Sequence, residues 1–412
     1  MPGGPQRAGA DQPPPFGETR AVGTDLGAVD LDVSAAVNGR LDGLLAERTA
    51  QARDLDPVFA SDLAARVARF TLEGGKRTRA QFLWWALRAC GGTVGDAEAA
   101  LRIGSALELI QTCALIHDDV MDGSRLRRGQ PAVHAELEGQ YAGCVSAAQS
   151  GRFGESAAIL AGDLALVWAD DIVADTGLSP ERAERVRALW SAMRMEMVAG
   201  QYLDIQGQVT STRSLAHAIR AACLKSALYS VERPLALGAA LADADDSTTA
   251  ALCSAGRCVG IAFQLRDDLN DIFGTGQGGK PSGGDIRSGK PTYLVAVAEA
   301  RAQARDDRGA LNVLRDSLGR PGLSPDGLAR VREVLVSTGA RATTEAKIDR
   351  LAAQGMRHLE SATLDLAGRD RLRTLLWSAT GTSSVGTAVS AGSHPAPPPA
   401  PSLLVAADGI RQ

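Results

Sequence analysis

Between its two ends the chain reads as one helix after another, and this periodicity limits the fold more than any other feature. Apolar residues recur at helical spacing, in runs that begin near a Ser or Asp able to cap a helix. No stretch alternates apolar and polar residues with the period of two that indicates a strand, and no solenoid repeat appears. The sequence therefore predicts an all-α fold, formed by one large helical domain. The expected helices cover residues 31–50, 58–71, 78–90, 97–121, 156–174, 179–206, 214–242 and 247–273.

The two ends of the chain differ from the body in composition. Residues 1–28 are rich in Pro and Gly, and residues 379–412 are dominated by Ser, Gly, Ala and Pro. Segments of this kind have too few apolar side chains to bury. We therefore expect a disordered N-terminal tail and a low-complexity C-terminal tail around a single domain of residues 29–378.

Charge and hydropathy exclude several classes of partner. The formal net charge is −4, which is the wrong sign for a protein that binds nucleic acid through a global basic field. The N-terminus lacks an apolar secretory region, and no uninterrupted apolar run reaches membrane-spanning length. The six cysteines form no C-x-x-C pair, as expected for small buried residues in a reducing compartment. The sequence favours a cytoplasmic protein with no nucleic-acid partner and no integral membrane segment.

Two D-D-x-x-D segments stand at the C-terminal ends of apolar helices. Residues three and four apart share a helix face, so each set of three carboxylates is expected to converge. Close carboxylates repel, and a helix C-terminus disfavours negative charge further. Mg²⁺ would neutralise them, because it takes oxygen ligands and bridges carboxylates to phosphates. One such segment could equally be a solvated acidic helix end, but two favour a metal site. The expected metal ligands are Asp118, Asp119, Asp122, Asp267, Asp268 and Asp271.

Small groups of basic residues accompany the acidic segments. They lie at the Gly-Gly start of a helix, directly after the first acidic segment, within a later helix, and in a Gly-rich loop after the second segment. One group alone is usually a solvated basic patch. Several beside two metal-type acid clusters indicate a site for two diphosphates. The groups contain Lys76, Arg77 and Arg79; Arg125, Arg127 and Arg128; Lys225; and Lys280 and Lys290.

At this point the ordered set of motifs resembles the trans-isoprenyl diphosphate synthase (polyprenyl synthetase) family, and most closely its bacterial geranylgeranyl diphosphate synthases. Besides the two acidic segments, the set contains G-G-K-R-T-R at Gly74, R-R-G-Q-P-A-V-H at Arg127, A-I-L-A-G-D at Ala158, G-Q-Y-L-D at Gly200, K-S-A-L-Y-S at Lys225 and G-D-I-R-S-G-K-P-T at Gly284. The resemblance covers residues 31–376. It implies a helical bundle around a deep central cavity, usually paired as a homodimer.

The resemblance also implies a reaction and the residues that perform it. The chain would condense isopentenyl diphosphate with an allylic diphosphate, using Mg²⁺. Isopentenyl diphosphate would be bound by Lys76, Arg79, Gln111 and Arg128. The allylic diphosphate would be bound by Arg127, Lys225, Ser226, Gln264 and Lys280, with Lys290 in a loop of variable length. Ionisation would depend on Asp118, Asp122, Arg127, Lys225 and Asp267, whose three aspartates would be the principal Mg²⁺ ligands.

Product length is expected to depend on the helix before Asp118. Ala114, Ile110 and Leu107 lie roughly beneath Asp118 at successive helical turns, and the resemblance adds Cys113. A large aromatic residue at position 113 or 114 would favour short products, whereas both residues here are small. We therefore expect geranylgeranyl diphosphate, with twenty carbons. The alternative products contain fifteen, twenty-five or more carbons.

Two other functions share part of this pattern. A class I terpene cyclase also has an Asp-rich helix end, but it usually replaces the second acidic segment and lacks a second diphosphate site. A non-catalytic regulatory subunit tends to lose one acidic segment. Both segments are intact here, and so is the second basic set, which argues against either function.

Overall fold

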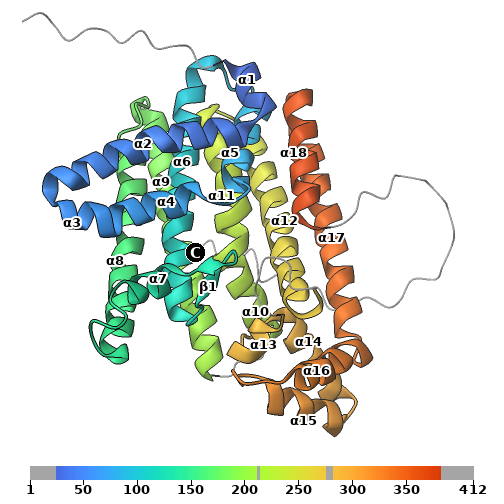
Figure 1. The fold of residues 1–412 in the computed structure, drawn as a ribbon. Coiled ribbons are helices and arrows are strands. Elements are labelled where there is room, and N and C mark those ends of the chain that lie inside the picture. Colours follow the sequence, from blue (N-terminus) through green and yellow to red (C-terminus); the bar gives the residue numbers. More distant parts are fainter. Residues whose placement is uncertain (1–24, 211–213, 275–281, 382–412) are drawn as a thin grey trace, which may run out of the picture. The chain divides into compact units, whose positions relative to one another are not determined.

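The computed structural model describes residues 25–210, 214–274 and 282–381, and almost every element in those ranges is a helix (Figure 1). The expectation of an all-α fold is therefore confirmed. The first elements are α1 (Leu26–Leu31), α2 (Val33–Leu55), α3 (Pro57–Phe59), the π-helix η1 (Ala60–Ala64), α4 (Ala65–Leu72), α5 (Thr78–Ala89) and α6 (Val94–Met121).

The middle of the chain contains a short hairpin followed by long helices. Its strands, β1 (Leu126–Arg127) and β2 (Gln130–Pro131), pair in antiparallel register. They were not predicted because two residues are too few to show a period of two. The helices after them are α7 (Val133–Gln140), α8 (Ala147–Ala174), α9 (Pro180–Thr210), α10 (Leu215–Ala222), the π-helix η2 (Cys223–Glu232), α11 (Arg233–Leu241) and α12 (Asp246–Phe273). The last are α13 (Gly284–Ser288), α14 (Tyr293–Ala304), α15 (Arg308–Ser317), α16 (Pro325–Ser337), α17 (Ala340–Ser361) and α18 (Leu366–Ala379).

Side-chain caps determine where the long helices begin. Thr93 and Asp96 form a capping box at the start of α6, and Ser146 and Gln149 form another at the start of α8. The Asp245 side chain accepts a hydrogen bond from the first turn of α12. These contacts satisfy N–H groups that have no partner within the helix. The caps explain why α6 and α12 begin within three residues of their predicted starts.

Several boundaries differ from the prediction, and the helix expected over residues 58–71 is divided into α3, η1 and α4. Helix α1 begins at Leu26, inside the segment predicted as a tail. Helix α8 begins at Ala147 rather than at residue 156, because its cap overrides the low helix propensity of the glycines in its first turns. The helix predicted over residues 214–242 is divided into α10, η2 and α11. The rest of the predicted tails, residues 1–24 and 382–412, lies outside the described residues.

The π-helix η2 lies in close backbone contact with both α9 and α12. A Cβ at Gly200 of α9 would lie 2.2 Å from the backbone nitrogen of Lys225, and a Cβ at Gly260 of α12 would lie 2.6 Å from the Cα of Ala227. Only glycine permits such an approach. The two helices therefore hold η2 in place, which fixes the backbone position of Lys225.

Helices α6 and α12 are the two elements that end in the acidic segments. Helix α6 packs against α8, α5 and α2, and α12 packs against α17, η2 and α11. Of the helices in the described ranges, α6 alone is long and apolar enough to cross a membrane, but 72% of its apolar window is buried inside the protein. Its apolar character is thus that of a core helix.

Candidate active site

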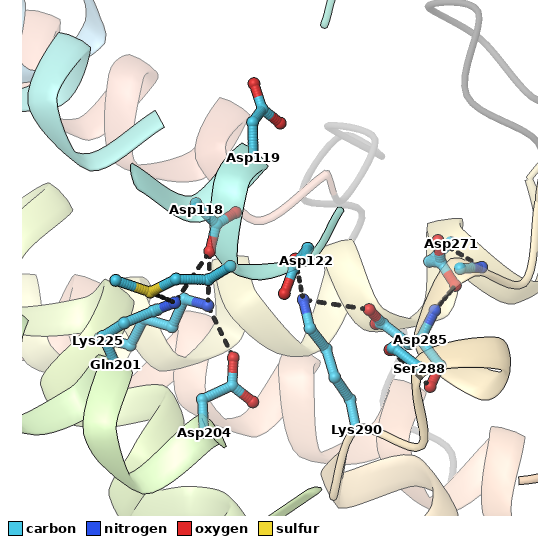
Figure 2. Close-up of polar contacts among 12 residues, drawn as sticks. Asp118, Asp119, Asp122, Gln201, Asp204, Lys225, Asp271, Asp285, Ser288 and Lys290 are labelled. Atoms are coloured by element: carbon cyan, nitrogen blue, oxygen red, sulfur yellow. Dashed lines mark hydrogen bonds and ion pairs between the residues drawn. The ribbon is translucent and has the colours of Figure 1, made fainter. Parts of the chain in front are cut away.

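The carboxylate of Asp118, near the end of α6, faces side chains from two other helices (Figure 2). Lys225 Nζ of η2 and Gln201 Nε2 of α9 each donate to Asp118 Oδ1 at 3.2 Å. Burial alone would raise the pKa of Asp118, but the charges of Lys225, Lys290 and Arg127 outweigh burial and lower the pKa below its usual value. Asp118 is therefore ionised at neutral pH.

Asp119 points away from Asp118 and Asp122 (Figure 2). Its side chain is 1% exposed, and both carboxylate oxygens accept a hydrogen bond from Arg127 Nε at 3.0 Å. Neighbouring residues on a helix do not share a face. The three carboxylates of the first segment thus do not converge as predicted. Asp119 is positioned to orient Arg127, and this pairing does not favour its predicted role as a metal ligand.

Asp122, the C-cap of α6, lies beside an ammonium group from the loop after α13. Lys290 Nζ is 3.7 Å from Asp122 Oδ2 and 3.4 Å from Asp285 Oδ1. Burial and the charge of Asp118 raise the pKa of Asp122 even though Lys290 opposes them. The charge of Asp285 is the main cause that raises the pKa of Lys290, so this lysine stays protonated.

The second acidic segment ends α12, and its first two carboxylates lie in opposite environments. Asp267 is exposed, whereas Asp268 is buried and accepts a hydrogen bond from Gln264 Nε2 at 2.8 Å. Gln264 Oε1 in turn accepts a hydrogen bond from the Ser226 hydroxyl. Burial, together with the charge of Asp285, raises the pKa of Asp268 well above its usual value. Ser226 and Gln264, two predicted contacts of the allylic diphosphate, therefore meet beside the second segment.

Asp271 is held by the backbone at the start of α13. Its Oδ1 accepts a hydrogen bond from the Gly284 N–H at 3.2 Å, and its Oδ2 accepts one from the Asp285 N–H at 3.0 Å. Burial and the charge of Asp285 raise the pKa of Asp271 to about 6. Because Lys290 contacts both Asp122 and Asp285, a continuous chain of polar contacts joins the end of α6 to the end of α12 (Figure 2).

Besides Asp285, two residues of α9 without a predicted role belong to this site. Asp204 Oδ2 of α9 lies 2.6 Å from Lys225 Nζ, and Gln201, one turn earlier on the same helix, contacts Asp118. Burial lowers the pKa of Lys225, but Asp118 and Asp204 outweigh it and raise the pKa above its usual value. Both residues lie in the G-Q-Y-L-D segment. An amide and an acid three residues apart share one helix face, and this was the signal that could have identified them.

The predicted contacts of the second diphosphate lie around the start of α5 and the β1–β2 hairpin. Lys76 is exposed, and Arg79 stacks on Tyr229 with its Cζ 4.5 Å from the ring centroid. Arg128 has a positive φ of 54° and lies against Gly74, where a Cβ would be 1.7 Å from the guanidinium. The glycine therefore leaves the space that the Arg128 side chain occupies.

Arg77 supports this loop from inside the protein. Its side chain is buried, forms an ion pair with Glu108 at 3.1 Å, and donates to Asn38 Oδ1 at 2.7 Å and to the Thr71 carbonyl at 2.8 Å. Its φ of 50° lies in the left-handed region, which is strained for a residue other than glycine. After burial, the charge of Arg77 is the next cause that lowers the pKa of Arg128. The contacts of Arg77 therefore fix the turn between Lys76 and α5.

The residues predicted to control product length lie along α6, and they differ in how exposed their side chains are. Ala114 is partly exposed, and the other three are buried: Cys113, Ile110 and Leu107. Burial raises the pKa of Cys113 to about 12, so its thiol is neutral. His117 Nε2 donates to the Ile159 carbonyl of α8 at 3.0 Å, which indicates a structural role for this histidine. Lys280, a predicted contact of the allylic diphosphate, lies outside the described residues.

The acidic side chains fit a hard divalent cation that is shared with phosphate. In the described ranges, no three acidic, His or Cys side chains converge into a complete metal site. Mg²⁺ commonly uses only one or two protein carboxylates and completes its shell with water and substrate phosphates. Burial raises the pKa of both Asp268 and Asp271, so the second segment has more carboxylate than its neighbours neutralise. A bound cation would relieve this excess.

Comparisons with known proteins place the chain among enzymes of isoprenoid synthesis. The model of the polyprenyl synthetase family matches residues 61–320. The geranylfarnesyl diphosphate synthase of Aeropyrum pernix is 31% identical over 271 residues, which cover 65% of this chain and 77% of that protein. The geranylgeranyl diphosphate synthase of Mycobacterium tuberculosis is 37% identical over 243 residues, which cover 58% of this chain and 62% of that protein.

A solved structure shows the same arrangement over most of the chain. The geranylgeranyl pyrophosphate synthase of Corynebacterium glutamicum, complexed with isoprenyl diphosphate and magnesium, matches with a TM-score of 0.79 and 38% identity, over 84% of this chain and 97% of that chain. Farnesyl diphosphate synthases also match the sequence. The names of the relatives therefore span several product lengths and do not determine the length made here.

Proposed function

The chain belongs to the polyprenyl synthetase family and is a trans-prenyltransferase, and from this premise we propose that it condenses isopentenyl diphosphate with an allylic diphosphate, giving mainly geranylgeranyl diphosphate. The observation that carries the proposal is the joining of both acidic segments in one site through Lys290 and Asp285. Lys225 adds a second ammonium group beside Asp118. Acids and cations gathered in this way suit a metal-bound diphosphate that leaves as an anion.

The first chemical event is the loss of diphosphate from the allylic substrate, which leaves a resonance-stabilised cation. Lys225 and Arg127 would bring positive charge to the departing diphosphate, and we assign Lys280 the same role. Asp118 orients the Lys225 ammonium, and Asp119 orients the Arg127 guanidinium. Charges fixed in advance stabilise developing charge without reorganisation during the reaction. Ser226 and Gln264 would complete the contacts of this diphosphate.

Mg²⁺ would be held by Asp118, Asp122 and Asp267, with Asp268 and Asp271 as further carboxylates of the second segment. When bound, it supplies positive charge that neutralises the leaving diphosphate. Asp119 would contribute through Arg127, because its two oxygens are already occupied by that side chain.

The second substrate would be bound on the other side of the site. Lys76, Arg79, Gln111 and Arg128 would hold the diphosphate of isopentenyl diphosphate. The double bond of this substrate attacks the allylic cation and forms the new carbon–carbon bond. Loss of one proton then restores a double bond, and the released diphosphate is the base that we propose for this step. No side-chain nucleophile is needed.

The test is a primer series. The purified protein is incubated with Mg²⁺, isopentenyl diphosphate and each of dimethylallyl, geranyl and farnesyl diphosphate, and the products are measured by mass spectrometry. We expect diphosphate release and a main product of twenty carbons. Failure to extend any primer would refute the function. A main product of another length would refute only the assignment of geranylgeranyl diphosphate.

Product length can be tested separately on α6. Each five-carbon unit needs about one helical turn, roughly 5.4 Å. Ala114 is one turn below Asp118 and partly exposed, so Ala114→Phe should block growth there and shorten the main product while turnover is largely kept. Ile110→Ala or Leu107→Ala should lengthen the product if these residues contribute to the floor. An unchanged product distribution in Ala114→Phe would mean that this face of α6 does not contact the growing chain.

We also propose that the protein acts in the cytoplasm as a homodimer. Helix α8 presents a row of exposed apolar residues that suits burial against a second copy of the chain. They are Ile159, Leu160 and Val167, with exposed fractions of 47%, 58% and 53%. Light scattering of the purified protein would show a particle of twice the chain mass, and a single-chain mass at working concentration would refute the dimer.

A further inference from the structure

Two side chains assigned to isopentenyl diphosphate, Arg79 and Gln111, meet on one tyrosine. The Tyr229 hydroxyl donates a hydrogen bond to Gln111 Oε1 at 2.8 Å. The Arg79 guanidinium lies over the Tyr229 ring, and its Nη2 donates to Ser230 Oγ at 2.8 Å. Tyr229 itself is only 3% exposed. A buried residue therefore contacts two residues that we place in the binding site.

These contacts leave donor groups available for an anion. A glutamine amide has an acceptor end and a donor end. Because the Tyr229 hydroxyl occupies the oxygen of Gln111, the NH₂ group is the end that remains, and no acceptor for it is found in the described ranges. Arg79 Nε is buried and also lacks a partner there. The NH₂ group of Gln111 would be satisfied by an oxygen of a diphosphate, and the guanidinium of Arg79 would add positive charge beside it.

Tyr229 lies on η2, the segment that also carries the contacts of the other substrate. Lys225 and Ser226 precede Tyr229 and Ser230 by four residues. Helical residues four apart lie on the same side, so one face of η2 serves both diphosphates. The backbone of η2 is held by Gly200 of α9 and by α12, which makes this face a rigid support.

We propose that Tyr229 is a positioning residue for isopentenyl diphosphate, with its hydroxyl fixing the amide of Gln111 and its ring fixing the guanidinium of Arg79. Ser230 assists by holding Arg79 Nη2. This inference rests on the proposed function, since it takes the ligand of these two side chains to be the second diphosphate. It predicts that a change at the buried Tyr229 affects the binding of one substrate only.

The test begins with Tyr229→Phe, which removes the hydroxyl and keeps the ring. The KM for isopentenyl diphosphate should rise about three- to tenfold, the size expected for the loss of one oriented hydrogen bond. The KM for the allylic diphosphate and kcat should change less than about twofold. Tyr229→Leu also removes the stacking on Arg79 and should raise the same KM further. Tyr141→Phe is the matched control, because this tyrosine is exposed and its ring packs on Phe153, which has no assigned role in the site; it should leave both constants unchanged.

A double-variant cycle separates positioning from a general effect on the fold. In a Gln111→Ala background, Tyr229→Phe should raise the KM for isopentenyl diphosphate no further, because no amide is left to orient. Independent effects of the two changes, or equal rises for both substrates, would overturn the proposal. If the Tyr229 variants do not fold, Ser230→Ala provides the same test through Arg79, and an unchanged KM for isopentenyl diphosphate would then count against the proposal. Wild-type protein that extends no primer refutes the proposed function instead, so the two failures are distinguishable.

Discussion

The first acidic segment, at the end of α6, is compensated mainly by cations, whereas the second, at the end of α12, is compensated mainly by neutral hydrogen-bond donors. Lys225 lowers the pKa of Asp118 against the effect of burial. In the second segment, Asp268 is bound by the amide of Gln264 and Asp271 by backbone N–H groups, and burial raises the pKa of both. The two segments have the same spacing of aspartates, but the surroundings of their carboxylates differ. At Asp118 the neighbouring cations outweigh the effect of burial on the pKa, whereas at Asp268 and Asp271 the neutral donors do not.

The largest expected effect comes from removing one carboxylate of either segment. Asp118→Asn and Asp267→Asn should each lower kcat by about 100- to 1,000-fold, roughly 3–4 kcal/mol, because each removes stabilisation of the leaving diphosphate. The measurement is steady-state kinetics at saturating Mg²⁺, with circular dichroism to show that the fold is kept. Asp349→Asn, an exposed acid on α17 outside the motif set, is the matched control. Near-normal rates for both variants would show that the segments are not the metal site.

A smaller effect is expected from removing the ammonium group that contacts both segments. Lys290→Met leaves Asp122 and Asp285 without their shared partner. In a chelator, the free energy of unfolding should fall by about 1–3 kcal/mol, less than for a fully buried pair because the Lys290 side chain is 21% exposed. Added Mg²⁺ should restore more stability in the variant than in wild type. Thermal unfolding with and without Mg²⁺ measures both quantities.

The control for this change is a lysine without an acidic neighbour. Burial and the charge of Arg350 lower the pKa of Lys347 on α17. Lys347→Met therefore removes a positive charge that does not compensate a carboxylate. Its stability should not respond to Mg²⁺. A Mg²⁺ response in Lys347→Met equal to that in Lys290→Met would mean that Lys290 does not stand in for a cation between the segments.

The smallest expected effect is on the pH dependence of stability without metal. The pKa of Asp271 is about 6 in the folded state against its usual 3.8, so between these values the folded state holds more protons than the unfolded state. The free energy of unfolding should therefore fall as pH rises from about 4 to 6, by on the order of 1–2 kcal/mol from this group. Urea unfolding in a chelator should show a steeper fall for wild type than for Asp271→Asn. Parallel curves would contradict the raised pKa.

Much of the fold and part of the site follow from local sequence patterns. The ends of α6 and α12 were predictable because apolar periodicity, a capping residue and a terminal acidic segment agree at each helix. The presence of two acidic segments with the same spacing predicted that they share one metal site. The sequence motifs around Lys225, Ser226 and Gln264 predicted that these residues contact the substrate. These features depend on residues close together in the chain, where helical spacing is a reliable guide.

The remaining features depend on contacts between distant segments. The direction of Asp119 is set by Arg127, which reaches back from the hairpin, and no helical spacing contains that information. The π-helix η2 depends on the approach of Gly200 from α9, and the role of Asp204 depends on its meeting Lys225. The raised pKa of Asp268 results from burial. The sequence does not indicate this burial, because an acidic segment at a helix end is usually solvent-exposed.

The most direct test of the account is whether the two segments act as one site. The measurement is the single-turnover release of diphosphate from the allylic substrate by Asp118→Asn, Asp267→Asn and the double variant. Residues that act as a unit are strongly non-additive. With a single shared site, the double variant should be about as slow as the slower single variant, because the loss of one carboxylate already prevents the metal from stabilising the leaving diphosphate. Losses that multiply in the double variant would mean that the segments stabilise the leaving group independently, and the account of a single shared site would be wrong.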